Sequence, residues 1–177
     1  AHHYQTWLKQ KQVDTVKRVS ISVSENIPYF LGVDSGSTTT KMVLINENAE
    51  VVFTHYLPNL GDSMGAFAQC LKLLNESVIN SENLHIAASC ATGYGENLLK
   101  AAYNMPYGIV ETMAHFMAAH YVQPNVSFVL DIGGQDMKAI FVRNGSIERM
   151  EINEACSSGC GSFIQTYAQT MNIDINK

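Results

Sequence analysis

Two short segments combine an aspartate, glycine, polar side chains and a lysine at the same spacing. They are Asp34-Ser35-Gly36-Ser37-Thr38-Thr39-Thr40-Lys41 and Asp131-Ile132-Gly133-Gly134-Gln135-Asp136-Met137-Lys138. An offset of 97 residues (131 − 34) aligns the two aspartates, Gly133 with Gly36, and the two lysines. Glycine lets backbone N–H groups approach phosphate, and a carboxylate can order the waters around Mg²⁺. One segment alone could be a plain hairpin turn, but two in register indicate loops that clamp one ligand.

Both segments lie between two expected strands, whereas Walker and dinucleotide-binding loops join a strand to a helix. The G-x-x-x-x-G-K-[ST] spacing is absent, and no G-x-G-x-x-G follows a strand. Asp34 and Asp131 are the candidate catalytic carboxylates, and Gln135 could orient an attacking water. The candidate phosphate-site residues are Ser35, Gly36, Ser37, Thr38, Thr39, Lys41, Gly133, Gly134, Asp136 and Lys138.

The elements that position these loops follow from hydrophobic periodicity. It predicts strands over Tyr29–Asp34, Lys41–Ile45 and Glu50–Tyr56, then a helix over Ser63–Ile79. A short buried strand over Leu84–Ser89, a helix ending near Tyr103, a strand near Tyr107–Val110 and a helix from Glu111 to about Tyr121 follow. The order β-β-β-α-β-α-β-α predicts an α/β fold with a mixed sheet. The pattern then restarts with strands over Phe128–Asp131, Met137–Val142 and Ser146–Ile152, with a turn at Arg143-Asn144-Gly145.

Composition narrows the class of protein. The 177 residues are 46% hydrophobic and 15% charged, which argues against disorder, and a net charge of −5 argues against a nucleic-acid partner. No apolar run reaches the roughly 18 to 20 residues of a membrane span, so we expect a cytoplasmic protein without a membrane partner. Four cysteines are too few for a secreted disulfide framework. Cys70 and Cys90 are expected to be small core residues, and His115 and His120 to be packing or hinge residues.

The segments "GVDSGSTTTK" and "LDIGGQDMK" resemble the two phosphate loops of the acetate kinase, sugar kinase, Hsp70 and actin superfamily. This resemblance implies an actin-like ATPase fold, which is ribonuclease H-like, with ATP or ADP and Mg²⁺ bound between two lobes. The segments "ATGYG", "DIGGQD" and "NEACSSGCGSF" are similar to the activator family of 2-hydroxyacyl-CoA dehydratases and benzoyl-CoA reductases, most closely to its longer members with two copies of the domain.

The activator resemblance implies an ATP-hydrolysing protein that passes one electron from a four-iron four-sulfur cluster to a CoA-ester dehydratase or reductase. It also implies a homodimer that shares the cluster, and an electron donor such as ferredoxin or flavodoxin. Cys156 matches a cluster ligand of the family, and a position at the start of a helix favours its thiolate. Cys160 does not match a family ligand and receives no role.

The expected organisation is a linker or tail over residues 1–27, a first lobe over 28–125, and the start of a truncated second lobe over 126–177. We expect the chain to be a fragment that is inactive alone, with an exposed apolar face on its second lobe. Two other functions stay open. A sugar or carboxylate kinase of the same superfamily would share the phosphate loops. A non-catalytic nucleotide-binding domain of a larger protein would bind nucleotide without turnover.

Overall fold

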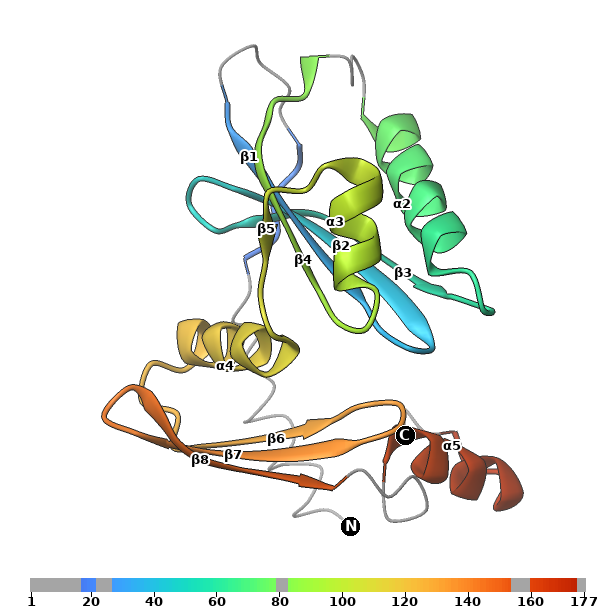
Figure 1. The fold of residues 1–177 in the computed structure, drawn as a ribbon, viewed down its shortest axis with the longest axis vertical. Helices are drawn as coiled ribbons and strands as arrows, with labels where there is room; N and C mark the ends of the chain where they lie inside the picture. Colours follow the sequence, from blue (N-terminus) through green and yellow to red (C-terminus); the bar gives the residue numbers. More distant parts are fainter. Residues whose placement is uncertain (1–16, 22–26, 79–82, 154–159, 175–177) are drawn as a thin grey trace.

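The computed structural model describes residues 17–21, 27–78, 83–153 and 160–174, which form two β-sheets with a helix between them (Figure 1). The first sheet has five strands in the order β3-β2-β1-β4-β5, and the second has three in the order β6-β7-β8. None of the helices in these ranges is long and apolar enough to cross a membrane. Most of the expected linker, and Cys156, lie outside the described residues.

The first sheet and its helices follow the predicted order β-β-β-α-β-α-β-α, which is thereby confirmed. Strands β1, β2 and β3 form an antiparallel meander, and β4 and β5 extend the sheet in parallel from β1. Helices α2 and α3 pack on one side of this sheet (Figure 1). The bounds are β1 Tyr29–Ser35, β2 Thr39–Asn46, β3 Val51–Pro58, α2 Ser63–Ser77, β4 Ile86–Thr92, α3 Glu96–Tyr103, β5 Tyr107–Gly108 and α4 Glu111–Val122.

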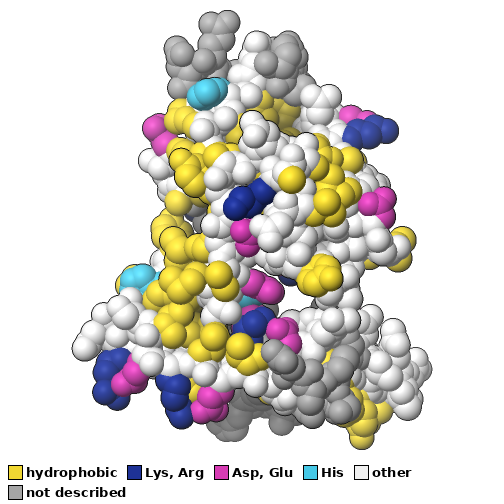
Figure 2. Space-filling model, viewed as in Figure 1, with side chains coloured by type: hydrophobic (Ala, Val, Ile, Leu, Met, Phe, Trp, Pro, Cys, Tyr) yellow, Lys and Arg dark blue, Asp and Glu magenta, His cyan; other side chains and the backbone are white. Residues whose placement is uncertain are grey.

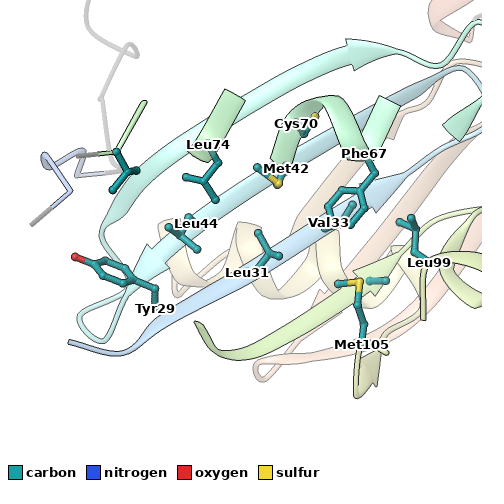
Figure 3. Packing of buried hydrophobic residues seen from close by; sticks show 12 residues of the cluster. Tyr29, Leu31, Val33, Met42, Leu44, Phe67, Cys70, Leu74, Leu99 and Met105 are labelled. Carbon is teal, nitrogen blue, oxygen red and sulfur yellow. The ribbon is translucent and has the colours of Figure 1, made fainter. Parts of the chain in front are cut away.

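Alternation along β1 and β2 builds the core. Every second side chain faces α2, because successive residues of a strand point to opposite sides of the sheet. Figure 3 shows these strand residues packed against the apolar side of α2. Cys70 is completely buried there, as predicted. The labelled members of this cluster are Tyr29, Leu31, Val33, Met42, Leu44, Phe67, Cys70, Leu74, Leu99 and Met105.

The prediction that the fourth strand is buried was only partly right. Strand β4 starts and ends later than predicted, and its first residues, Ile86 and Ala87, are exposed. The physical reason is the shortness of its neighbour: β5 has two residues and pairs with Cys90 and Ala91 alone. The early half of β4 therefore lies at an open edge of the sheet.

The second sheet consists of β6 (Phe128–Ile132), β7 (Met137–Arg143) and β8 (Ser146–Asn153), and α5 (Gly161–Thr170) follows it. One face packs on α4 through a small cluster of Phe116, Ile140 and Val142. The Asn144-Gly145 turn has positive φ at both residues, 53° and 73°, as a two-residue hairpin turn of this type requires.

The other face of the second sheet is partly exposed along strand β6. Its strand β6 leaves Phe128, Leu130 and Ile132 between 44% and 50% exposed. Helix α5 likewise exposes a row of apolar side chains, among them Phe163 and Tyr167. The expected exposed apolar face is therefore confirmed for this part of the chain.

Candidate functional site

The two phosphate-loop candidates are the same hairpin built twice. Asp34 lies opposite Lys41 in the register of β1 and β2, and Asp131 lies opposite Lys138 in the register of β6 and β7. The turn between each pair of strands closes with an equivalent hydrogen bond. The amide of Gly36 donates to the carbonyl of Thr39 and that of Gly133 to the carbonyl of Asp136, both at 2.9 Å. The two segments related by an offset of 97 residues therefore share the same strand register and the same hydrogen bond across the turn.

The two hairpin turns face one another across a cleft of about 520 Å³. A Cβ placed on Gly134 would lie 3.0 Å from Thr38 Oγ1, so the loops approach closely at this point. Figure 2 shows acidic and basic side chains gathered at the junction between the two parts of the molecule. The predicted residues that line the cleft are Asp34, Gly36, Ser37, Thr38, Thr39, Lys41, Asp131, Gly133, Gly134, Gln135 and Asp136.

Two predicted phosphate-site residues do not line this cleft. The Ser35 side chain is completely buried beneath Gly95, and its hydroxyl has no hydrogen-bond partner among the described residues. The Lys138 side chain is only 8% exposed and lies behind the second loop, where it contacts carboxylates instead of solvent. The side chains of Ser35 and Lys138 are therefore buried next to the loops and do not face the cleft. Cys156 lies in the segment that the structure leaves undescribed.

Carboxylates dominate the electrostatics of the cleft. Lys41 Nζ lies 2.7 Å from Asp34 Oδ2, and Lys138 Nζ lies 2.7 Å from Asp136 Oδ2 and 3.8 Å from Asp131 Oδ2. Lys138 is also 3.8 Å from Glu111. Burial opposes the charge of Lys138, but the nearby carboxylates, Asp136 and Glu111 foremost, outweigh it and raise the pKa of the ammonium above its usual value. A phosphate ligand in this cleft would therefore need a cation as well as Lys41.

Helix α4 adds two residues that sequence reasoning did not place in the site. Glu111 and His115 both line the cleft, and His115 Nδ1 lies 2.6 Å from Asp131 Oδ2. The predicted packing role of His115 is therefore wrong, while the alternative, a hinge role, stays a prediction. His120 does pack, because its ring stacks on Phe116. The missed signal was the spacing of four between Glu111 and His115, which places both on one face of a helix.

Asn59 holds the first loop in shape and was also missed. It is 5% exposed, and its Nδ2 donates a 2.8 Å hydrogen bond to the carbonyl of Gly36. Its Oδ1 accepts a 2.6 Å hydrogen bond from the Thr40 hydroxyl, and its backbone amide donates to the carbonyl of Thr38 at 2.8 Å. One buried amide side chain therefore fixes both ends of the turn.

The Ala91–Gly95 segment packs under the first loop from the other side. Gly93 has φ +86°, and a Cβ there would lie 2.7 Å from both Asp34 Oδ1 and the Ser35 carbonyl, so only glycine fits. The amide of Gly95 donates to the Ser35 carbonyl at 2.8 Å. Tyr94 between them is 90% exposed and lines the cleft, so its side chain is free to contact a ligand.

A second cavity of about 590 Å³ adjoins the cleft on the side of the sheet away from α2. It shares Asp34 and Lys41 with the cleft, but the rest of its lining is largely apolar and includes the half-buried Cys90. The hydroxyl and amide groups suited to a phosphate ligand, and the carboxylates suited to its cation, are concentrated in the smaller cleft. We therefore assign the candidate site to the cleft between the loops.

Comparison with known proteins finds relatives among activators of CoA-ester dehydratases. An (R)-2-hydroxyglutaryl-CoA dehydratase activating ATPase from Acidaminococcus fermentans is 31% identical over 148 residues, covering 84% of this chain and 55% of the relative. A crystal structure of component A of that dehydratase has a TM-score of 0.70 at 32% identity and covers 83% of this chain and 55% of its own. An activator of 2-hydroxyisocaproyl-CoA dehydratase from Clostridium difficile, with bound ADPNP, has a TM-score of 0.68 at 25% identity and covers 83% and 53%.

These likenesses confirm the expected actin-like ATPase fold. The chain spans about half the length of the curated relatives it matches. The family match itself extends over residues 31–177, and so includes both phosphate-loop candidates, helix α4 and helix α5. The chain belongs to the BadF/BadG/BcrA/BcrD ATPase family.

Proposed function

We propose that the chain binds ATP with Mg²⁺ in the cleft, as part of an ATP-hydrolysing activator of a CoA-ester dehydratase or reductase. The observation that carries the proposal is the pair of equivalent Asp–Lys hairpins that face each other across one cleft. Two similar loops on opposite walls suit a chain of phosphates, because each wall can hold one end of it. The relatives named as activating ATPases, and the one with bound ADPNP, support the same reading.

The chain's own residues would act by binding and positioning. Ser37, Thr38 and Thr39 line the cleft, and their hydroxyls and backbone amides can donate hydrogen bonds to phosphate oxygens. Gln135, on the second loop, is exposed to the cleft and can orient a water for attack on the terminal phosphate. Lys41 would exchange part of its contact with Asp34 for a phosphate oxygen.

A divalent cation fits the charge of the cleft. Four carboxylates, of Asp34, Glu111, Asp131 and Asp136, line it beside one lysine, and Asp34 Oδ1 has no hydrogen-bond partner in the described part of the chain. Mg²⁺ would supply charge neutralisation between these groups and the phosphates. Asp34 and Asp131 would hold the waters around the ion.

The electron-transfer part of the proposal rests on Cys156 and on the relatives. Among the described residues, none of the three cysteines, Cys70, Cys90 and Cys160, belongs to a group of three or more potential metal ligands. A four-iron four-sulfur cluster held by Cys156 in a homodimer, reduced by ferredoxin or flavodoxin, is proposed for the complete protein.

Nucleotide binding and turnover test the proposal. Mg·ATP binding would be measured by calorimetry and phosphate release by a colorimetric assay, on the complete protein and on its Asp131→Asn variant. We expect the substitution to lower phosphate release by at least about a hundredfold, because it removes a charge that positions the reacting groups. Glu76→Gln, on the exposed side of α2, is the control and should change neither quantity.

The same assays separate the other functions. Phosphate transfer to a sugar or carboxylate acceptor would replace the proposal with a kinase, and nucleotide binding without turnover in the complete protein would replace it with a non-catalytic domain.

The electron-transfer part of the proposal has a separate test. Iron and sulfide would be assayed in the anaerobically purified complete protein and in Cys156→Ser. Equal cluster content in both would contradict the assignment of Cys156.

A further inference from the structure

Three ligand-type side chains meet at the floor of the cleft. One carboxylate oxygen of Asp34, one of Glu111 and one ring nitrogen of His115 lie within 4.8 Å of one another. They come from two elements, since Asp34 lies on β1 and the other two lie one turn apart on α4. One metal ion with bonds of roughly 2.0 to 2.2 Å to nitrogen and oxygen holds its donor atoms within about 4.4 Å of one another. Small side-chain movements would therefore bring these three groups onto one ion.

The position of Asp131 is an independent indication of metal ligation by His115. Its Oδ2 lies 2.6 Å from His115 Nδ1. Metal-ligating histidines donate their second ring N–H to a carboxylate or carbonyl, which fixes the tautomer and the orientation of the ring. An imidazole that donates from Nδ1 to Asp131 keeps the lone pair of Nε2 for a metal ion.

The three candidate ligands also have unused bonding capacity. Asp34 Oδ2 contacts Lys41, but Asp34 Oδ1 is buried and accepts no hydrogen bond from the described residues. Glu111 has Lys138 near its carboxylate, at 3.8 Å, which is beyond hydrogen-bond distance. Leaving the buried Asp34 Oδ1 without a partner is costly, and a bound cation would satisfy it.

We propose that Asp34, Glu111 and His115 directly bind one first-row divalent transition ion, with Asp131 as the residue that orients His115. The mixed donor set determines the class of metal: carboxylates suit Mn²⁺ and Mg²⁺, but an imidazole ligand favours transition ions over Mg²⁺, which prefers oxygen and retains its waters. The proposal goes beyond nucleotide binding. The proposed metal site lies in the same cleft, but the protein ligands of the ion are side chains and no ATP is required for the ion to bind.

Mn²⁺ is the probe, added to the nucleotide-free protein. The loss of the free-ion EPR signal during titration counts the sites, and pulsed EPR detects the magnetic coupling of a ligated ¹⁴N nucleus to the ion. We expect one Mn²⁺ per chain with nitrogen coupling. His115→Gln should abolish the coupling and weaken binding by more than about tenfold, and Asp131→Asn should weaken binding by about 10- to 100-fold while retaining the coupling.

Matched variants make the result specific. His85→Gln changes an exposed histidine outside the cleft and should leave affinity and coupling unchanged. Glu111→Gln should weaken binding as His115→Gln does, with coupling retained. Absence of tight Mn²⁺ binding, or binding without nitrogen coupling in the wild type, would overturn the proposal, and the wild-type spectrum alone decides this if a variant fails to fold. Because nucleotide is omitted, failure here leaves the proposed ATP site testable by calorimetry.

Discussion

The backbone N–H of Gly161 donates a 2.8 Å hydrogen bond to the carbonyl of Gly133. Gly161 is the first residue of α5, and Gly133 is the first glycine of the second loop, so the start of this helix rests directly on the candidate phosphate loop. A Cβ on Gly161 would lie 2.9 Å from the Gly133 carbonyl oxygen, closer than side-chain carbons normally come. A shift of the loop when a terminal phosphate leaves would therefore reach the helix that follows Cys156.

Gly161→Ala should uncouple α5 from the nucleotide. The added methyl group forces the helix start and the loop apart, while the groups that face the cleft remain. We expect nucleotide affinity to change by no more than a few-fold. The difference in hydrogen exchange over residues 161–170 between the ADP state and a state with a non-hydrolysable ATP analogue should disappear. Gln165→Ala, an exposed change on the same helix, should preserve that difference; its loss in both variants would contradict the coupling.

Asn59→Ala should destabilise the protein and weaken nucleotide binding together. The substitution leaves the Gly36 carbonyl without its side-chain donor and the Thr40 hydroxyl without its acceptor, in a buried setting. We expect a loss of about 1–3 kcal/mol in the free energy of unfolding. Urea denaturation measures the stability and calorimetry the affinity. Asn97→Ala, on the exposed side of α3, should change stability by less than about 0.5 kcal/mol, and an equally small effect for Asn59→Ala would rule out its role.

The strands and helices were predictable because their patterns are local. Alternation along Tyr29–Ser35 and the apolar spacing of Ser63–Ser77 each result from burying one face on the same core. The Asn144-Gly145 turn was predictable because few residues adopt positive φ at two successive positions. The exposed half of β4 was not, because its burial depends on how many residues β5 contributes beside it.

Only part of the candidate site was predictable. The two loops were visible because they repeat each other in sequence, but Asn59 stabilises the first loop from 23 residues away and has no local pattern. The position of His115 in the cleft was missed because its partner, Asp131, lies on strand β6, and only the tertiary fold brings the two side chains within 2.6 Å. Residues that act through distant contacts leave no periodic signal, so the structure was needed to find them.

Lys138→Met should remove a pH-dependent contribution to stability. Burial disfavours the ammonium, but Asp136, Glu111 and Asp131 reverse that effect and raise its pKa above 10.5. Because the pKa of Lys138 is higher in the folded state, its protonated form favours folding. This contribution to stability is complete below pH 10.5 and is lost as the pH rises through the folded-state pKa. The wild type should therefore exceed the variant by about 1–3 kcal/mol at pH 7 to 9, with the difference shrinking above pH 10.5.

Urea denaturation at several pH values measures the Lys138 effect. Lys72→Met is the control, because Lys72 is 74% exposed and its neighbour Glu76 lies 3.8 Å away, so its removal should have little effect at any pH. A difference between the wild type and Lys138→Met that grows above pH 10.5 would contradict the sign of the shift.

Gln135→Ala should separate catalysis from binding. Its side chain is exposed to the cleft on the second loop, and in the proposed function it orients water and does not hold the phosphates. Removing a water-positioning group affects the transition state more than bound ATP, so kcat should fall by about a hundredfold while KM changes little. Steady-state phosphate release measures both constants. Gln69→Ala on the exposed side of α2 should match the wild type, and a large rise in KM at unchanged kcat would instead make Gln135 a binding residue.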